Sequence, residues 1–224
     1  TISTLSLPDT YNSLRLSTYP SNMISRLLVD FYKEWGTQFH IEYHEGSVEE
    51  ITDHVHQGIS EIGIVYVALK QVQTFQHILT HKNLEFVPQD VKKICVYVGP
   101  NHPLYHTESI DFEDLSSLKF MRGVRDFFSM EHHLERVSMG VIDNEKLHHV
   151  VYTNSDHLII DLLLHSDVCS LGLDFMHEPY TQYAIKSLPI NGCEPFLQMG
   201  YVFNPERALS AQARWVVERF RKML

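Results

Sequence analysis

The sequence is poor in clustered basic residues and in paired cysteines, and each shortage excludes a class of protein. It has 18 lysines and arginines against 28 aspartates and glutamates, so the formal net charge is −10. A surface that neutralises nucleic-acid phosphates needs clustered Lys and Arg, so these residues are not expected to contact DNA themselves. The three cysteines lie far apart without a CxxC pair, which argues against a disulfide framework or a zinc ribbon and fits a reducing cytoplasm.

Long apolar runs and enzyme motifs are also missing. No stretch reaches the ~18 consecutive apolar residues of a membrane span. The N-terminal TISTLSLPDTYNS lacks the basic and then apolar order of a secretory signal, so we expect a cytoplasmic protein with no membrane partner. GxSxG, a Walker loop, HExxH and GxGxxG after a strand are all absent. We therefore expect no enzymatic activity and no cofactor.

What the first third of the chain does contain is a regular alternation of strand and helix patterns. A short strand at 14–18, a helix between Pro20 and Gly36, and a second strand at 39–43 come first. A helix over 48–58 leads to the continuous apolar run at 62–67, which is typical of a buried parallel strand. This order predicts an α/β unit with right-handed crossovers.

The rest of the chain continues in the same manner. We expect helices over residues 69–81, 128–139, 155–163 and 209–224. We expect strands at residues 93–99, 119–122, 148–153, 171–175 and 197–203. The economical interpretation is two α/β lobes with the chain crossing between them.

Four segments match a known family in order and spacing. They are LRLSTYPSNMISRLLVDFYKEW, HEGSVEEITDHVHQGISEIGIVYV, KKICVYVGPNHPLYHTESIDFEDLSSLKFM, and YTNSDHLIIDLLLHSDVCSLGL followed by IKSLPI. Together they resemble the effector-binding domain of LysR-type bacterial transcription regulators. Two departures stand out: Glu61 replaces the usual Asp of an "x-D-x-x-I" strand, and residues 165–169 replace a Gly-rich turn.

The resemblance covers residues 13–224 and implies both a fold and an assembly. The fold is α/β and periplasmic-binding-protein-like (type II), with two Rossmann-like lobes joined by two crossing strands. Lobe I would take residues 12–90 and 200–224 and lobe II residues 91–199, after a linker remnant at 1–11. Family members bind a small-molecule effector between the lobes, form homodimers or homotetramers, and reach promoter DNA through a winged helix-turn-helix that has no counterpart in these residues.

Candidate effector contacts follow the predicted strands. Open α/β sheets bind ligands beyond the carboxyl ends of their strands, where helix N-termini present free N–H groups. Three such places carry hydroxyl or amide side chains, and the resemblance implies effector contacts there and at one residue after the third strand. The residues are Tyr19, Ser21, Asn22, Ser47, Tyr66, Thr153, Asn154 and Ser155. For each Ser or Asn the alternative is a helix cap, and one residue can serve both purposes.

Two arginines after the strand at 119–122 favour an anionic effector. Arg122 and Arg125 lie in MRGVRD, and a guanidinium can hold a carboxylate through two parallel hydrogen bonds. We therefore expect a small carboxylate effector. The alternative for each arginine is an exposed side chain paired with Asp126 or with solvent.

The fifteen histidines raise the possibility of a metal sensor. His77 and His81 stand four residues apart on an expected helix, a spacing that can chelate zinc. His40 and His44 have the same spacing on an expected strand, and the remaining histidine pairs have no Cys or carboxylate at metal-site spacing. A surface rich in histidine is the favoured interpretation, so no metal site is predicted and the metal sensor stays an alternative.

Two other functions share the expected fold. An extracytoplasmic solute-binding receptor has the same two lobes, and a signal peptide upstream would favour it whereas a helix-turn-helix would favour the regulator. An enzyme is the third possibility, since fold does not dictate function. For the regulator, the family resemblance also implies side-by-side antiparallel dimers in which the helix at 48–58 and the strand at 39–43 meet lobe II of a neighbour.

Overall fold

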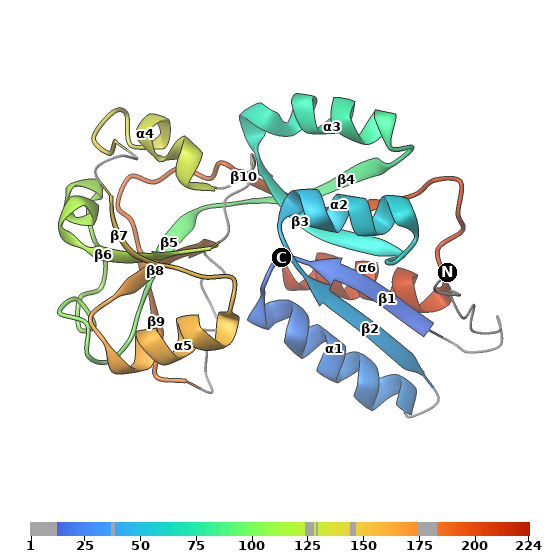
Figure 1. Cartoon of the computed structure of the whole chain (residues 1–224), viewed down its shortest axis with the longest axis horizontal. Helices are drawn as coiled ribbons and strands as arrows, with labels where there is room; N and C mark the ends of the chain where they lie inside the picture. Colours follow the sequence, from blue (N-terminus) through green and yellow to red (C-terminus); the bar gives the residue numbers. More distant parts are fainter. Residues whose placement is uncertain (1–12, 37–38, 124–127, 129, 144–146, 174–182) are drawn as a thin grey trace, which may run out of the picture. The chain divides into compact units, whose positions relative to one another are not determined.

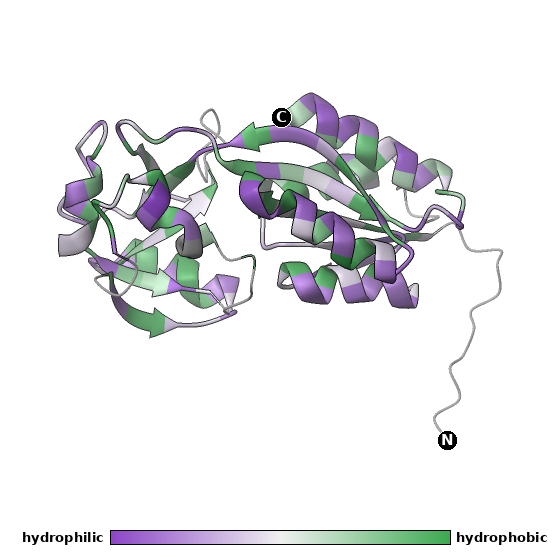
Figure 2. Ribbon diagram, turned by 90° about the horizontal axis from the view of Figure 1, so that it is seen from above, coloured by the Kyte–Doolittle hydropathy of each residue, from purple (hydrophilic) through white to green (hydrophobic). Residues whose placement is uncertain are grey.

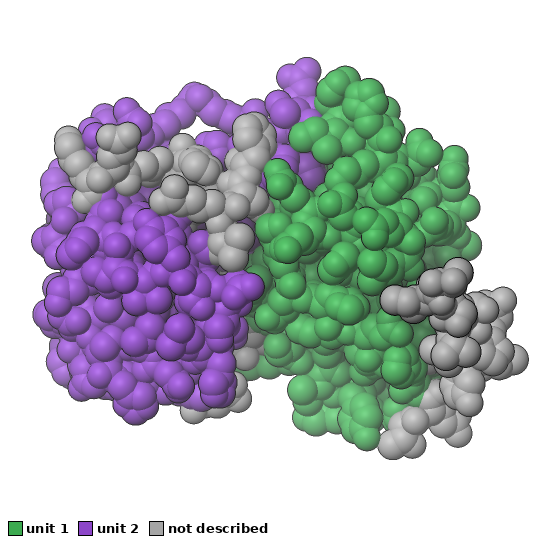
Figure 3. All heavy atoms as spheres, in the orientation of Figure 1, with its two compact units in different colours: residues 1–65, 76–89, 200–224 green, residues 66–75, 90–199 purple. Residues whose placement is uncertain are grey.

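The computed structural model describes residues 13–36, 39–123, 128, 130–143, 147–173 and 183–224. The chain forms two compact units, coloured separately in Figure 3: unit 1 takes residues 1–65, 76–89 and 200–224, and unit 2 takes residues 66–75 and 90–199. Residues 66–75 therefore group with unit 2, whereas the sequence-based division keeps them in lobe I. The expected linker at 1–11 lies outside the described residues.

The first sheet has the strand order β2-β1-β3-β10-β4 (Figure 1). Its strands are β1 (Ser13–Thr18), β2 (His40–Glu45), β3 (Ile62–Ala68), β4 (Glu85–Lys92) and β10 (Leu197–Phe203). β1 pairs in parallel with both β2 and β3. Its buried Leu14 and Leu16 and the almost wholly buried β3 supply the centre of the core. The continuous apolar run of β3 is what a strand covered on both faces requires.

Local capping fixes where the crossover helices begin and end. α1 (Asn22–Trp35) starts after Ser21, whose hydroxyl accepts from the Ile24 amide, and ends at Gly36 with a φ of 74°. α2 (Val48–Gln57) starts with a capping box: the Glu50 amide donates to the Ser47 hydroxyl at 3.2 Å and the Glu50 carboxylate accepts from the Ser47 amide at 2.8 Å. Both starts are as the sequence predicts, since Ser is a favoured N-cap.

An aromatic cluster joins α1 to the closing helix α6 (Ala211–Met223). The buried Phe31 ring stacks on Trp35 at 5.7 Å and meets Trp215 edge-on at 5.4 Å. The Trp215 indole N–H donates to the Glu34 carboxylate at 2.9 Å. Full burial of one such Phe contributes roughly 1.5–3 kcal/mol, so the cluster is a main tie between the first and last helices. In Figure 2 the helices carry both hydrophilic and hydrophobic residues, as helices packed on one side do.

Unit 2 holds a second, mixed sheet with the order β7-β6-β8-β5-β9. Its strands are β5 (Ile94–Val98), β6 (Lys119–Arg122), β7 (His148–Tyr152), β8 (Cys169–Leu173) and β9 (Lys186–Pro189). β6 pairs in parallel with β7 and β8, whereas β5 pairs antiparallel with β8 and β9. α5 (Asp156–His165) connects β7 to β8 and packs its apolar side near Met121 and Val168.

Two strands, β4 and β9, are not predicted from the sequence, and one predicted helix is wrong. β4 contains Pro88 and lies at the end of the sheet order, where a proline without an N–H is tolerated. The helix expected over 128–139 is reduced to η4 (Met130–His133) and α4 (Leu134–Val137). Met139 and Gly140 have positive φ angles of 52° and 85°, which end the helical path.

The other expected helices agree with the sequence pattern in position. The expected helix at 69–81 is a short η2 (Leu69–Gln71) continued by α3 (Val72–His81). η3 (Phe112–Ser117), which is not predicted from the sequence, precedes β6. At residues 165–169, which replace the Gly-rich turn of the family, the Ser166 amide donates to Leu162 O at 3.0 Å and Ser166 has a φ of −139°, so no glycine is required. No helix among the described residues is long and apolar enough to cross a bilayer.

The histidine of the PNHPL turn after β5 is a structural residue. His102 is 4% exposed, and its Nδ1 accepts a hydrogen bond from the Leu104 amide at 3.1 Å. Because an accepting Nδ1 carries no proton, the turn needs this nitrogen unprotonated. Burial lowers the pKa of His102, and the nearby Asp167 carboxylate opposes that shift only in part.

This burial predicts an acid-sensitive contribution to stability. The unfolded chain takes up a proton at His102 near pH 6.5 and the folded chain only at lower pH, so stability is lost as the pH falls from about 6.5 towards the lowered pKa. We expect melting temperatures measured between pH 7.5 and 5.5 to fall more steeply for the wild type than for His102→Asn, which keeps an acceptor without a titrating ring. If the melting temperatures of the two proteins fall equally with pH, the prediction is wrong.

Candidate functional site

In the first sheet the predicted contact residues lie at one edge, where β1 and β2 end. Thr18, the last residue of β1, stands in register with Glu45 at the end of β2 and with Ile64 of β3. The Gly46 amide donates to Thr18 O at 3.0 Å, and this hydrogen bond holds the end of β1 beside the residue that follows β2. Tyr19 and Ser21 follow β1, Ser47 follows β2, and Tyr66 lies two residues beyond Ile64, as expected from parallel pairing.

The end of β1 is polar and buried at once. Ser17 and Thr18 are fully buried, and Tyr19 and Ser21 are each 8% exposed. The Ser17 hydroxyl lies 2.6 Å from the Ser60 hydroxyl and 2.9 Å from His54 Nδ1, so it belongs to a network that ties β1 to α2. The Thr18 hydroxyl has no hydrogen-bond partner within the described part of the chain. An unpaired buried hydroxyl costs about 1–3 kcal/mol, so this group is suited to a further partner.

Thr18 was not singled out from the sequence. Its position as the last strand residue before YPSN was visible, but a β-branched residue in a strand is ordinary, and only burial without a partner distinguishes it. Of the predicted residues nearby, Ser21 and Ser47 do act as helix caps. The side chain of Asn22, at the first position of α1, lies outside the described part of the structure.

In unit 2 a second set of predicted residues meets at the carboxyl ends of β6 and β7. Arg122 ends β6 in register with Tyr152, and the Thr153 amide donates to Arg122 O at 3.0 Å. The Thr153 hydroxyl accepts from the Ser155 amide at 3.0 Å, and the Ser155 hydroxyl accepts from the Leu158 amide at 3.3 Å to cap α5. The exposed Asn154 lies between them. A hydroxyl-bearing helix N-terminus therefore stands beside an arginine.

Arg122 is the most informative residue of this set. It is 9% exposed, and its Nε has no hydrogen-bond partner among the described residues. A guanidinium stays charged at any ordinary pH, and a buried charge is costly unless an anion is paired with it. The arrangement of Arg122, Thr153 and the α5 N-terminus is therefore suited to an anionic group. Arg125, the second predicted arginine, lies outside the described residues.

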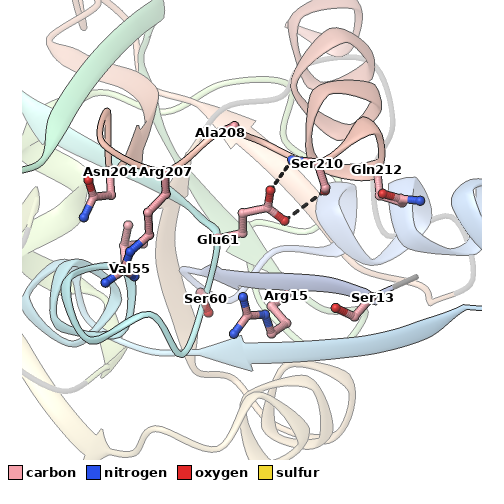
Figure 4. A pocket seen from close by; sticks show the side chains of 10 residues that line it. All are labelled: Ser13, Arg15, Val55, Ser60, Glu61, Asn204, Arg207, Ala208, Ser210 and Gln212. Atoms are coloured by element: carbon pink, nitrogen blue, oxygen red, sulfur yellow. Dashed lines mark hydrogen bonds between the residues drawn. The ribbon is translucent and has the colours of Figure 1, made fainter. Parts of the chain in front are cut away.

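A measurable pocket lies elsewhere in unit 1, at the opposite ends of the strands. It has a volume of about 290 Å³. Its lining residues, shown in Figure 4, come from the start of β1, the turn before β3, α2, and the segment from β10 into α6: Ser13, Arg15, Val55, Ser60, Glu61, Asn204, Arg207, Ala208, Ser210 and Gln212. None of the predicted effector contacts lines it.

The polar groups of this pocket are largely used by the fold itself. Both Glu61 carboxylate oxygens accept from Ser210, one from the amide and one from the hydroxyl, at the N-terminus of α6 (Figure 4). Arg15 donates to Gly58 O at 2.7 Å. Gly58 has a φ of 76°, and a Cβ there would come within 2.5 Å of Arg207. We therefore interpret the pocket as a joint between α2, β1 and α6, and the family departure at Glu61 as part of that joint.

The joint predicts a stability effect at Glu61. In Glu61→Gln an NH₂ group, which donates, replaces one of the two carboxylate oxygens that accept from Ser210. The change also removes the negative charge that stabilises the N-terminus of α6. We expect a loss of about 1–3 kcal/mol, which lowers the melting temperature by roughly 2–4 °C per kcal/mol for a chain of this size. The control is Glu206→Gln, which changes an exposed residue in the same connecting segment. If the two variants have the same melting temperature, the interpretation of the pocket as a joint is wrong.

The described residues contain no cluster of three metal ligands and no exposed thiol. No group of three or more His, Cys, Asp or Glu side chains converges among them. Cys95, Cys169 and Cys193 are free thiols and all buried. Burial, with the Asp167 charge as a second cause, raises the pKa of Cys169 far above its usual range, which suppresses the reactive thiolate.

Comparison with solved structures supports the fold at low sequence identity. The effector-binding domain of QuiR in complex with shikimate is 15% identical with a TM-score of 0.64, covering 95% of this chain and 98% of that one. A C-terminal domain of a probable LysR family regulator from Rhodococcus sp. RHA1 is 16% identical with a TM-score of 0.62, over 95% and 100%. The oxidized form of OxyR is 14% identical with a TM-score of 0.61, over 95% of each chain.

The family itself is shown by sequence. No curated protein matches the chain. The model of the LysR substrate binding domain, however, matches residues 13–224, nearly the whole chain. The expected α/β, periplasmic-binding-protein-like (type II) fold is thereby confirmed. The chain belongs to the LysR substrate binding domain family.

Proposed function

We propose that this chain is the ligand-sensing domain of a LysR-type transcription regulator and that its effector is a small carboxylate. The observation that carries the anionic character is the buried Arg122 Nε, which has no partner within the described part of the chain and follows β6 beside Thr153 and the α5 N-terminus. A carboxylate accepts two parallel hydrogen bonds from a guanidinium and further bonds from hydroxyls and amides at a helix start. The effector would in this way supply a partner for Arg122 Nε, which has none among the described residues.

The carboxyl ends of β1 and β2 would supply further contacts to the effector. Thr18, Tyr19 and Ser21 offer buried hydroxyls there, and Ser47 and Tyr66 are placed at the same strand ends. Hydroxyl groups on the effector would match these donors and acceptors. Shikimate, the molecule bound to QuiR, is a hydroxylated carboxylate and is the first compound to test.

Binding would act on the regulator by a shift of population. We propose that the effector lies between the two lobes and binds one arrangement of them more tightly than another. That difference would alter how subunits pair and how DNA-binding segments outside these residues meet a promoter. The family match favours this function over a solute receptor of the same fold.

Redox sensing through cysteine is not favoured, although the oxidized form of OxyR is among the similar structures. A sensing thiol needs exposure and a lowered pKa. Here the Cys95 Sγ lies 3.6 Å from Leu173 O and the Cys169 Sγ 3.4 Å from Lys119 O, both inside the fold. The thiols therefore act as small core residues.

A thermal melt against small carboxylates tests the proposal, with shikimate, benzoate and dicarboxylates in the panel. A ligand present at about 100 times its Kd adds about 2.7 kcal/mol, a rise of roughly 5–10 °C for this size. Arg122→Gln should weaken the binding of a hit by about 10- to 100-fold, because a charge-assisted pair contributes about 1.5–3 kcal/mol.

Two controls make this test specific. Arg136→Gln removes an exposed arginine of the same unit and should leave binding unchanged. Without effector, Arg122→Gln should melt no lower than the wild type, because it removes a buried and incompletely paired charge. If Arg122→Gln binds the hit as tightly as Arg136→Gln does, the proposed anion site is wrong.

Self-association is the second part of the proposal. β2 stands at one end of the strand order of its sheet, and α2 follows it directly in the chain. We expect sedimentation velocity to give a species of twice the 26.1 kDa chain mass, and Ile41→Asp on β2 to shift it to monomer. Val29→Asp on the exposed side of α1 is the matched control. A monomer produced by the α1 change alone would place the interface elsewhere.

A further inference from the structure

Two histidine rings stand together on the solvent-exposed side of α3. The Nε2 atoms of His77 and His81 are 3.3 Å apart, and their ring centroids are 4.8 Å apart with an interplanar angle of 83°. Both residues are exposed, so burial does not force the rings together. Within the described residues, the only polar contact recorded for either ring is the other ring.

The separation of the two nitrogens matches the requirement of a metal ion. Zinc binds imidazole nitrogen at about 2.0–2.1 Å with tetrahedral geometry, which places two ligand nitrogens about 3.3–3.4 Å apart. The rings therefore already stand at the distance at which one ion can bridge them. Without a metal, the Nε2–H of one ring donates to the Nε2 of the other. When a cation binds, that proton leaves for solvent or moves to Nδ1 of the same ring, and the helix need not move.

The backbone that carries the pair is held in place from α2. Lys82, the residue after His81, reaches the Asp53 carboxylate at 2.7 Å and the Thr52 hydroxyl at 3.2 Å. The Lys82 carbonyl accepts from His56 Nδ1 at 2.8 Å. The last turn of α3 is thus anchored, which reduces the entropy lost when the rings are fixed by a ligand.

We propose that His77 and His81 chelate a divalent transition-metal ion through their Nε2 atoms, at a site separate from the effector contacts. Imidazole suits Zn²⁺, Ni²⁺ and Cu²⁺, with Cu²⁺ bound most tightly of the three. No third Cys, His, Asp or Glu of the described residues joins the pair, so water completes the coordination. The site is therefore open and exchangeable, unlike a closed structural zinc site.

The test is calorimetric titration of the folded chain with Zn²⁺. Two variants distinguish the effect of the four-residue spacing between the histidines from the effect of the number of histidines. His77→Gln removes one ligand. His77→Gln combined with Gln76→His keeps all fifteen histidines but moves one ring about 100° around the helix, since each residue turns by that angle. Both positions are exposed, so the variants should fold, which circular dichroism checks.

We expect the tightest Zn²⁺ site of the wild type to weaken by on the order of 100-fold in both variants, because a chelate of two linked ligands becomes a single one. Imidazole NMR signals of His77 and His81 should be the first to shift in the wild type. If the double variant keeps the wild-type affinity, or if Zn²⁺ first shifts other histidines, the site does not exist. Effector binding plays no part in either readout.

Discussion

The arrangement of the candidate contacts depends on parallel strand pairing, with one strand in each sheet flanked by two parallel neighbours. β1 pairs in parallel with β2 and β3, and β6 with β7 and β8. Since parallel strands all end at the same edge, segments far apart in sequence are brought side by side there. The Gly46 amide meets Thr18 O, and the Thr153 amide meets Arg122 O. Every candidate effector contact that the structure describes follows from this one constraint.

The pocket around Glu61 differs from the candidate binding residues in whether its polar groups have hydrogen-bond partners within the fold. At the amino ends of the first sheet, Glu61, Ser210 and Arg15 find partners within the fold, so the pocket that they line is accounted for. At the carboxyl ends, Thr18 Oγ1 and Arg122 Nε are buried without a partner among the described residues. Unpaired buried polar atoms are rare in folded proteins, and those at strand ends are where a ligand is expected.

Much of the fold was predictable because the local signals agreed with one another. Ser21, Ser47 and Ser155 begin helices as N-caps, and the apolar run of β3 marks a buried strand. The sequence-based predictions fail where the place of a segment in the tertiary structure outweighs its local sequence pattern. β4 accepts Pro88 because it is an edge strand. The segment at 128–139 buries Phe128, Met130 and Leu134 from short turns instead of one continuous helix.

The sequence by itself determined the family, the order of strands and helices, and the turns at which polar residues follow strands, because caps and hydrophobic periodicity are local properties. Only the tertiary structure decided which of those residues are buried and which lack a partner. Burial depends on what distant segments pack alongside: Thr18 is enclosed and unpaired, His102 is kept neutral inside a turn, and Glu61 reaches Ser210 across 149 positions of sequence.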